Sequence, residues 1–150
     1  MRGRLRLNKH LNYVIFCADY QLKQIINVNK GKKMAYSDKF IQMGEAARAR
    51  VSAVQPNEVD ALLADGALAL DIRDKEEHDS DCIAGSKHIS RGKLEMNVEE
   101  EIPNLDTPII TYCNVNYRGA LSADSLQAMG YSNVRYIEGG LKAYRAWQNK

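Results

Sequence analysis

Short apolar runs alternate with amphipathic segments over most of the chain beyond residue 45. Residues 67–72 and 108–112 are short runs rich in apolar residues, which is typical of strands buried on both faces of a parallel sheet. Around them, apolar residues recur at helical spacing, as Val59 and Leu62 do, and glycines mark the helix ends. Strands are therefore expected at 51–54, 67–72, 88–89, 108–112 and 134–137, and helices at 45–50, 56–64, 98–102, 119–129 and after Gly140.

Strands that alternate with helices in this way predict an α/β fold, in which a small, mainly parallel sheet is flanked by helices. In such sheets, ligands bind beyond the carboxyl ends of the strands. Asp71 and Cys113 lie at two of these ends. The charged segment 73–81 follows directly and is expected to be a loop or a short helix. Candidate chemistry is thus predicted at one edge of the sheet.

Charge divides the chain unevenly, although the net charge of its 150 residues is only +2. Residues 1–34 hold eight basic residues and one acid, Asp19, so they carry +7 of that total and leave −5 for the remainder. A mildly acidic domain gives no support for nucleic-acid binding. No apolar stretch approaches the eighteen or so residues that a membrane helix needs, so no membrane partner is expected.

The basic segment 1–34 is the least domain-like part of the sequence. One interpretation is a disordered basic extension. The other is that the residues upstream of Met34 are not part of the native protein, because the lysine- and glycine-rich stretch before Met34 is what a purine-rich ribosome-binding sequence encodes when translated in frame. On either interpretation the functional domain is expected at residues 35–150.

The three cysteines, Cys17, Cys82 and Cys113, are widely spaced and form no C-x-x-C pair. Neither a disulfide framework nor a zinc site follows from this spacing, and a reducing compartment such as the cytoplasm fits best. The three histidines also lack neighbours at metal-ligand spacing. No metal and no organic cofactor is therefore expected.

Cys113 opens a six-residue segment, 113–118, between the expected strand 108–112 and the expected helix 119–129. At such a junction backbone N–H groups converge and the helix dipole presents its positive end, so a thiol is favoured as the reactive thiolate. Arg118 adds a permanent cation. The alternative interpretation is a buried cysteine that acts only as a small hydrophobic residue.

Several short motifs in a fixed order resemble the single-domain rhodanese (thiosulfate sulfurtransferase-like) family over about residues 54–148. Each motif alone is weak, but their order and spacing together are hard to obtain by chance. The motifs are Asp71-Ile72-Arg73 followed by Glu77, Ile83-Ala84-Gly85-Ser86, Ile89-Ser90-Arg91-Gly92 with Leu94-Glu95, Tyr112-Cys113 through Arg118, Met129-Gly130-Tyr131, and Glu138-Gly139-Gly140 ahead of Trp147.

The resemblance implies a sulfurtransferase without a cofactor. Cys113 would accept a sulfane sulfur as a persulfide, from thiosulfate or a persulfide donor, and pass it to a thiol, to cyanide or to a protein acceptor. The family's active-site loop, which would bind the substrate, corresponds here to Asn114, Val115, Asn116, Tyr117 and Arg118. For Arg118, either contact with an anionic donor or bracing of the loop is expected.

Two positions depart from the family's C-x-x-G-x-R-S pattern: Asn116 replaces the glycine and Gly119 replaces the serine. Asn tolerates a left-handed backbone better than most residues, so the loop is expected to keep its shape through a left-handed Asn116. Asp71, Arg73 and Glu77 are expected to give structural support as one ion-pair group.

Three questions stay open at this stage. Cys82 is either a packed thiol or a partner for Cys113 in a disulfide. The protein could instead be a non-catalytic rhodanese-like module that binds a partner or senses redox state. Phosphatase or arsenate reductase chemistry is a further alternative, although related enzymes with those activities have five residues between cysteine and arginine, whereas four separate Cys113 from Arg118.

Overall fold

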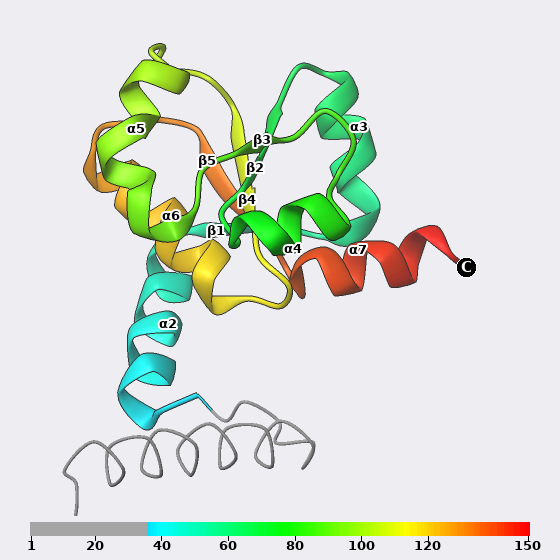
Figure 1. Cartoon of the computed structure of the whole chain (residues 1–150), viewed down its shortest axis with the longest axis horizontal. Coiled ribbons are helices and arrows are strands. Elements are labelled where there is room, and N and C mark those ends of the chain that lie inside the picture. The colour runs from blue at the N-terminus through cyan, green and yellow to red at the C-terminus, as the bar shows by residue number, and fades with distance from the viewer. Residues whose placement is uncertain (1–35) are drawn as a thin grey trace, which may run out of the picture. The chain divides into compact units, whose positions relative to one another are not determined.

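A parallel sheet of five strands, in the order β1-β5-β4-β2-β3, forms the centre of the fold (Figure 1). The computed structural model describes residues 36–150. Every neighbouring pair of strands is parallel, which confirms the predicted α/β fold with a mainly parallel sheet. The strands are β1 (Ser52–Val54), β2 (Leu68–Asp71), β3 (Lys87–His88), β4 (Ile109–Tyr112) and β5 (Val134–Ile137).

Helices cover both faces of the sheet, as Figure 1 shows. Helices α2, α5 and α6 contribute to one buried cluster, whereas α3 and α7 contribute to the other. Two short 3-10 helices, η1 (Pro56–Glu58) and η2 (Arg91–Lys93), precede α3 and α5. The α-helices are α2 (Asp38–Arg50), α3 (Val59–Ala64), α4 (Lys75–Ser80), α5 (Leu94–Glu101), α6 (Tyr117–Ala128) and α7 (Gly140–Gln148).

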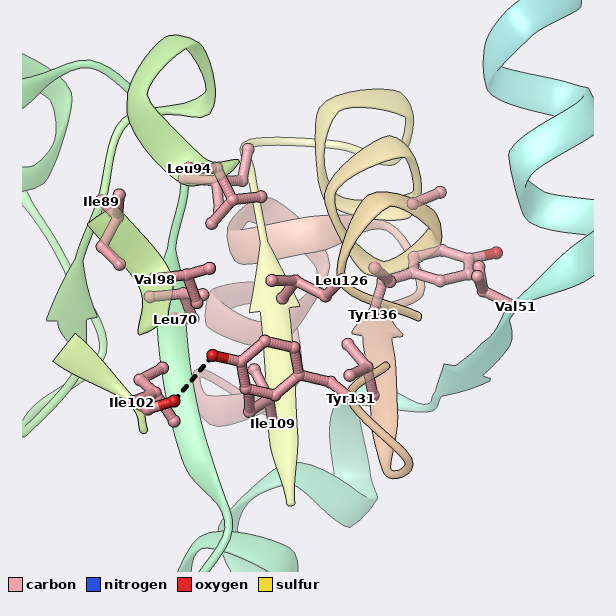
Figure 2. Packing of buried hydrophobic residues seen from close by; sticks show 14 of the residues in the cluster. Val51, Leu70, Ile89, Leu94, Val98, Ile102, Ile109, Leu126, Tyr131 and Tyr136 are labelled. Atoms are coloured by element: carbon pink, nitrogen blue, oxygen red, sulfur yellow. Dashed lines mark hydrogen bonds between the residues drawn. The ribbon is translucent and has the colours of Figure 1, made fainter. Parts of the chain in front are cut away.

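Strand β4 lies in the middle of the sheet and is buried along its whole length. Its side chains alternate between the two faces: Ile109 belongs to the cluster under α5 and α6, and Ile110 and Tyr112 to the cluster under α3 and α7. On the first face, the Tyr131 hydroxyl donates a hydrogen bond of 2.7 Å to the Ile102 carbonyl (Figure 2). The core thus fixes β4 from both sides.

Three helices begin earlier than the sequence pattern predicts. Helix α2 begins at Asp38 rather than near residue 45, because the Ser37 hydroxyl accepts a hydrogen bond from a first-turn amide. Helix α5 begins at Leu94, one turn before Val98, and both side chains are buried at helical spacing. Helix α6 begins at Tyr117, so its first turn is part of the segment 113–118.

The expectations for residues 1–34 lie outside the described residues. They include the basic extension and the alternative start at Met34, and both stay predictions. Within residues 36–150, no helix is long and apolar enough to cross a membrane.

Candidate active site

Cys113 follows β4 directly, where the central strand reaches the carboxyl edge of the sheet. It continues the alternation of the strand and joins the buried cluster that contains Ala120 of α6 and Ile72 after β2. Only 4% of the residue is exposed. The predicted junction of strand, cysteine and helix is therefore present, and the thiol lies in a largely apolar environment with little contact with solvent.

The first two carbonyl groups of the active-site loop, residues 113–118, accept hydrogen bonds from the first turn of α7. Leu141 N–H donates to the Cys113 carbonyl at 2.8 Å, and Lys142 N–H donates to the Asn114 carbonyl at 3.2 Å. Gly140 lies so close that a Cβ atom built on it would meet the Cys113 and Val115 carbonyl oxygens at 2.4 Å. The Gly139-Gly140 motif thus lets α7 approach the loop backbone.

The N–H groups just after Cys113, unlike the first carbonyl groups of the loop, have no hydrogen-bond partner in residues 36–150. Within the described part of the chain, those of Asn114, Val115 and Asn116 donate no hydrogen bond to another residue. The first turn of α6 adds the positive end of its dipole beside them. Unpaired backbone donors next to a helix start form a cradle that stabilises negative charge. The loop is therefore suited to an anionic group beside its unpaired N–H donors.

Asn116 corrects the expectation of a left-handed residue at this position. Its φ is −137°, and no residue other than glycine has a positive φ in residues 36–150. Its side chain explains why asparagine is present: the Asn116 Oδ1 accepts a hydrogen bond of 2.6 Å from the Gly139 N–H. The loop therefore keeps its shape through a side-chain link to the turn before α7 rather than through left-handed backbone.

Arg118 forms an ion pair with Glu77 of α4. Its two terminal nitrogens donate to the two carboxylate oxygens at 2.8 and 2.9 Å. These hydrogen bonds lower the pKa of Glu77 below its usual range and raise the pKa of Arg118, so both groups remain charged. The sequence predicted that Asp71, Arg73 and Glu77 form one ion-pair group. This prediction is wrong for Glu77, which forms its ion pair with Arg118. The ion pair links the last residue of the loop to α4.

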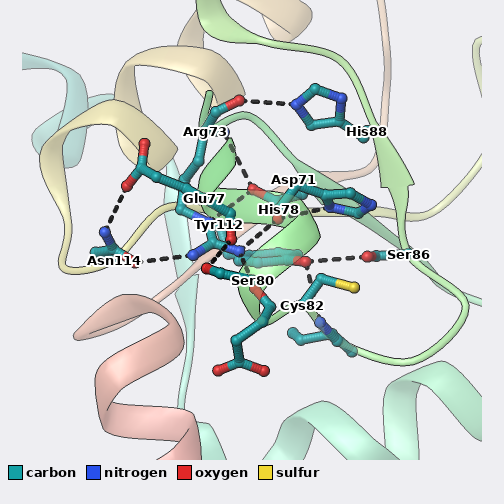
Figure 3. Close-up of polar contacts among 12 residues, drawn as sticks. Asp71, Arg73, Glu77, His78, Ser80, Cys82, Ser86, His88, Tyr112 and Asn114 are labelled. Carbon is teal, nitrogen blue, oxygen red and sulfur yellow. Dashed lines mark hydrogen bonds and ion pairs between the residues drawn. The ribbon is translucent and has the colours of Figure 1, made fainter. Parts of the chain in front are cut away.

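Asp71 and Arg73 form the expected ion pair, almost completely buried, at the end of β2. Burial alone would raise the pKa of Asp71, but hydrogen bonds from Arg73 and His78 outweigh it and hold that pKa below its usual range. Figure 3 shows how the Asn114 side chain joins this pair to Glu77: its Oδ1 accepts from Arg73 at 3.0 Å, and its Nδ2 donates to Glu77 at 2.6 Å. The Asn114 side chain is thus used for structure.

The rings of His78 and His88 stack with centroids 4.7 Å apart, although they are ten residues apart in the sequence. His78 Nδ1 lies 2.9 Å from an Asp71 oxygen, and His88 Nε2 lies 2.8 Å from the Arg73 carbonyl oxygen. Sequence spacing gave no sign of this pair, because the residues belong to different elements. No group of three or more metal-binding side chains occurs in residues 36–150.

Val115 and Tyr117, the remaining loop residues that were predicted to bind substrate, differ in their environment. Val115 is 41% exposed, at the outer surface of the loop. Tyr117 is half-buried against α2, and its hydroxyl donates to Glu45 Oε1 at 2.9 Å. The sequence analysis missed this contact with α2. The available signal was Gly44, since an isolated glycine in a helical segment often marks a close approach.

A parallel sheet covered by helices on both faces, with a cysteine between its central strand and a helix, defines the class of α/β domain to which this fold belongs. The family model of the rhodanese-like domain matches residues 55–147. That match covers more than half of the chain, and this protein belongs to the rhodanese-like domain family.

The chain is also similar to individual proteins and solved structures. The thiosulfate sulfurtransferase GlpE of Ectopseudomonas mendocina is 29% identical over 93 residues, which cover 62% of this chain and 84% of that protein. A Rhodopseudomonas palustris protein of unknown function, described as a possible tyrosine phosphatase, superposes with a TM-score of 0.68 at 28% identity and covers 79% of this chain and 97% of its own. The polysulfide-sulfur transferase of Wolinella succinogenes superposes with a TM-score of 0.63 at 25% identity and covers 73% and 84%. The first and the third of these proteins are named as sulfur transferases, and they support sulfurtransferase activity in general.

Proposed function

We propose that this protein is a sulfurtransferase that carries a sulfane sulfur on Cys113, taken from thiosulfate or a persulfide donor. The observation that carries the proposal is which backbone groups of the loop have hydrogen-bond partners and which do not. The Cys113 and Asn114 carbonyls are bound by α7, whereas the N–H groups of Asn114, Val115 and Asn116 donate to no other residue in the described chain. Donors fixed in this way stabilise developing negative charge without reorganisation.

The proposed reaction has two steps. With thiosulfate, the Cys113 thiolate attacks the outer sulfur, the S–S bond of thiosulfate breaks, and sulfite leaves with the bonding electrons as a dianion. The product is a Cys113 persulfide anion. A thiophile such as cyanide or a thiolate then attacks the outer sulfur of the persulfide, and the Cys113 thiolate is restored. This is covalent catalysis in which one difficult transfer becomes two easier ones.

The charged side chains favour support of the loop over direct capture of the donor. Arg118 donates both terminal nitrogens to Glu77, and Asn114 is bonded to Arg73 and Glu77. Backbone N–H groups and the exposed Val115 are therefore the parts of the loop left to meet the substrate. Asp71, Arg73 and Glu77 take the role of structural support, as a network that holds the loop from the side of α4.

A loop of this kind makes a persulfide as suitable a donor as thiosulfate, because no unshared side-chain cation in it selects a small dianion. A protein acceptor of sulfur is equally compatible with the exposed Val115. The chemistry needs a reduced thiol, for which the cytoplasm is the proposed location. Cys82 has a partly exposed thiol, and a resolving role for it stays a prediction.

The test is sulfur transfer by the full chain and by the Cys113→Ser variant. We expect thiosulfate to add one sulfur, about 32 Da, to the wild type only, and cyanide to remove it as thiocyanate. Glutathione persulfide is assayed in parallel as the second donor. A folded wild type that gains no sulfur from either donor would contradict the proposal and favour a binding or redox-sensing module. Aryl phosphate hydrolysis that depends on Cys113 would favour the phosphatase alternative.

A further inference from the structure

Helix α2 precedes the segment matched by the family model, yet it packs against the start of the active-site loop's helix. The family match begins at residue 55, whereas α2 ends at Arg50. Ala47 and Val51, at the end of α2, lie in the same buried cluster as Cys113. Figure 1 shows α2 beside α6, whose first residue, Tyr117, belongs to the loop. An element outside the family domain is thus part of the surroundings of the active site.

Three residues of α2 contact Tyr117. A Cβ atom built on Gly44 would lie 2.3 Å from the Tyr117 ring, so only glycine lets the ring lie this close to the helix. The Phe40 ring meets the Tyr117 ring edge to face, with centroids 6.0 Å apart. Glu45 Oε1 accepts a hydrogen bond of 2.9 Å from the Tyr117 hydroxyl. The position of Tyr117 is therefore fixed by shape and by a polar bond together.

The same helix is bonded to the second segment that supports the loop. Arg48 donates to Glu45 at 3.1 Å, to the Tyr136 hydroxyl at 3.0 Å and to Glu138 at 2.9 Å. Glu138 directly precedes Gly139, whose N–H is bound by Asn116 of the loop. A continuous chain of bonds therefore leads from Tyr117 through Glu45 and Arg48 to the turn before α7.

We propose that α2 is a brace that positions the active-site loop, with Glu45 and Tyr117 as positioning residues for the reaction at Cys113. Tyr117 is four residues from Cys113, and its movement would displace the N–H groups between them. The effect of the brace on catalysis rests on the proposed function. The brace should also affect how fast the Cys113 thiol reacts with an alkylating reagent, and this rate can be measured without any sulfur donor.

The variants are Tyr117→Phe, which removes the hydroxyl, Glu45→Ala, which removes the acceptor, and the two combined. Glu45→Gln keeps an acceptor oxygen and serves as the conservative rescue. The matched control is Arg50→Ala, because Arg50 also joins α2 to α6, through two bonds to Asp124 at 2.8 and 2.6 Å, but touches no loop residue. All are made in the full chain, and unfolding by urea is measured for each.

The main measurement is the rate of Cys113 alkylation by iodoacetamide between pH 5 and 9, read by peptide mass spectrometry so that the other cysteines are counted separately. We expect Tyr117→Phe and Glu45→Ala to slow alkylation near neutral pH about three- to tenfold and to shift the pH profile. The combined variant should lose no more than Glu45→Ala alone, because Glu45→Ala already removes the bond that Tyr117→Phe removes, together with the bond from Arg48. Glu45→Gln and Arg50→Ala should stay within about twofold of the wild type.

Sulfur transfer is then measured for the same variants, with the loss expected in kcat rather than KM. Unchanged alkylation profiles in Tyr117→Phe and Glu45→Ala would overturn the brace, as would an equal loss in Arg50→Ala. A wild type that transfers no sulfur would count against the proposed function alone, since the alkylation profiles still report on the brace.

Discussion

Gly140 shows, at the scale of single residues, how closely the active-site loop is packed. Its φ is +62°, a left-handed value that side chains with a Cβ rarely adopt. A Cβ would also meet the Cys113 and Val115 carbonyl oxygens at 2.4 Å and the Asn114 carbonyl carbon at 2.7 Å. Those atoms are backbone and cannot rotate away, so any larger residue must move the loop.

We therefore predict that Gly140→Ala is costly for both stability and activity. The left-handed strain and the overpacking together should lower the free energy of unfolding by roughly 2–5 kcal/mol. Gly85→Ala is the matched control, because Gly85 has a φ of +75° but no atom within 4 Å of a built Cβ. It should lose only about 1–2 kcal/mol and keep full activity. Urea unfolding and sulfur transfer check both variants, and equal losses would refute the packing argument.

Asn116 marks the limit of prediction for a single residue. The sequence shows that asparagine stands where the related loops have glycine, and conformational preference alone suggested a left-handed residue. The structure has a φ of −137° and a hydrogen bond to Gly139 instead. The partner lies 23 residues away, so no local rule could have found it.

A variant of Asn116 tests whether that link holds the loop. In Asn116→Ala the Gly139 N–H loses its acceptor, and we expect the free energy of unfolding to fall by about 1–3 kcal/mol and sulfur transfer about tenfold. Gln127→Ala is the control, since the Gln127 side chain also bonds a backbone group, the Val134 carbonyl at 3.2 Å, but lies near the end of α6 that is farther from the loop. Full activity in Asn116→Ala would show that α7 alone holds the loop.

At the scale of elements, the apolar pattern predicted most strands and helices but not where α2, α5 and α6 begin. Strands β2 and β4 are short apolar runs, and such runs are typical of parallel strands that are buried on both faces. Helix starts depend on capping and on tertiary contacts. Ser37 caps α2 about two turns before residue 45, where the pattern placed the start of this helix, and Tyr117, the first residue of α6, is bonded to Glu45 of α2.

The part of the candidate site that lies within one short segment could be predicted from the sequence. The contacts between distant elements could not. Cys113 at a strand-to-helix junction can be read from residues 108–119 alone. The partners of Arg118 and Tyr117 cannot, because Glu77 is 41 residues and Glu45 is 72 residues away in the sequence. A charged residue has many oppositely charged candidates along a chain, and only the fold selects one.

For the whole molecule, paired carboxylates link stability to pH. The pKa of Glu77 is lowered by Arg118, and that of Asp71 lies below its usual range because of Arg73 and His78. A lowered pKa in the folded state means that the unfolded chain binds protons first as the pH falls. The stabilisation is complete well above about pH 4.5 and is lost as the pH falls from there through the lower folded-state values.

The prediction is a steep loss of stability on acidification that depends on Glu77. Glu77→Gln should lower the free energy of unfolding at pH 7 by about 1–3 kcal/mol. Between pH 7 and pH 3, the free energy of unfolding should fall less in this variant than in the wild type. Glu101→Gln is the control, because its ion pair with Lys87 is exposed and contributes little. Urea unfolding at a series of pH values checks this, and an unchanged acid slope in Glu77→Gln would contradict it.

The sheet order has a consequence for how the protein is made. Among residues 36–150, strand β1 pairs with β5 alone, about eighty residues later, and α2 packs on α6, which is also made late. At synthesis rates of about 5–20 residues per second, β1 waits roughly 4–16 seconds for its partner to be translated. During that time an unpaired strand and an uncovered helix face are exposed on the growing chain. The nascent protein therefore passes through an interval in which chaperones and aggregation compete for the elements that later support the thiol.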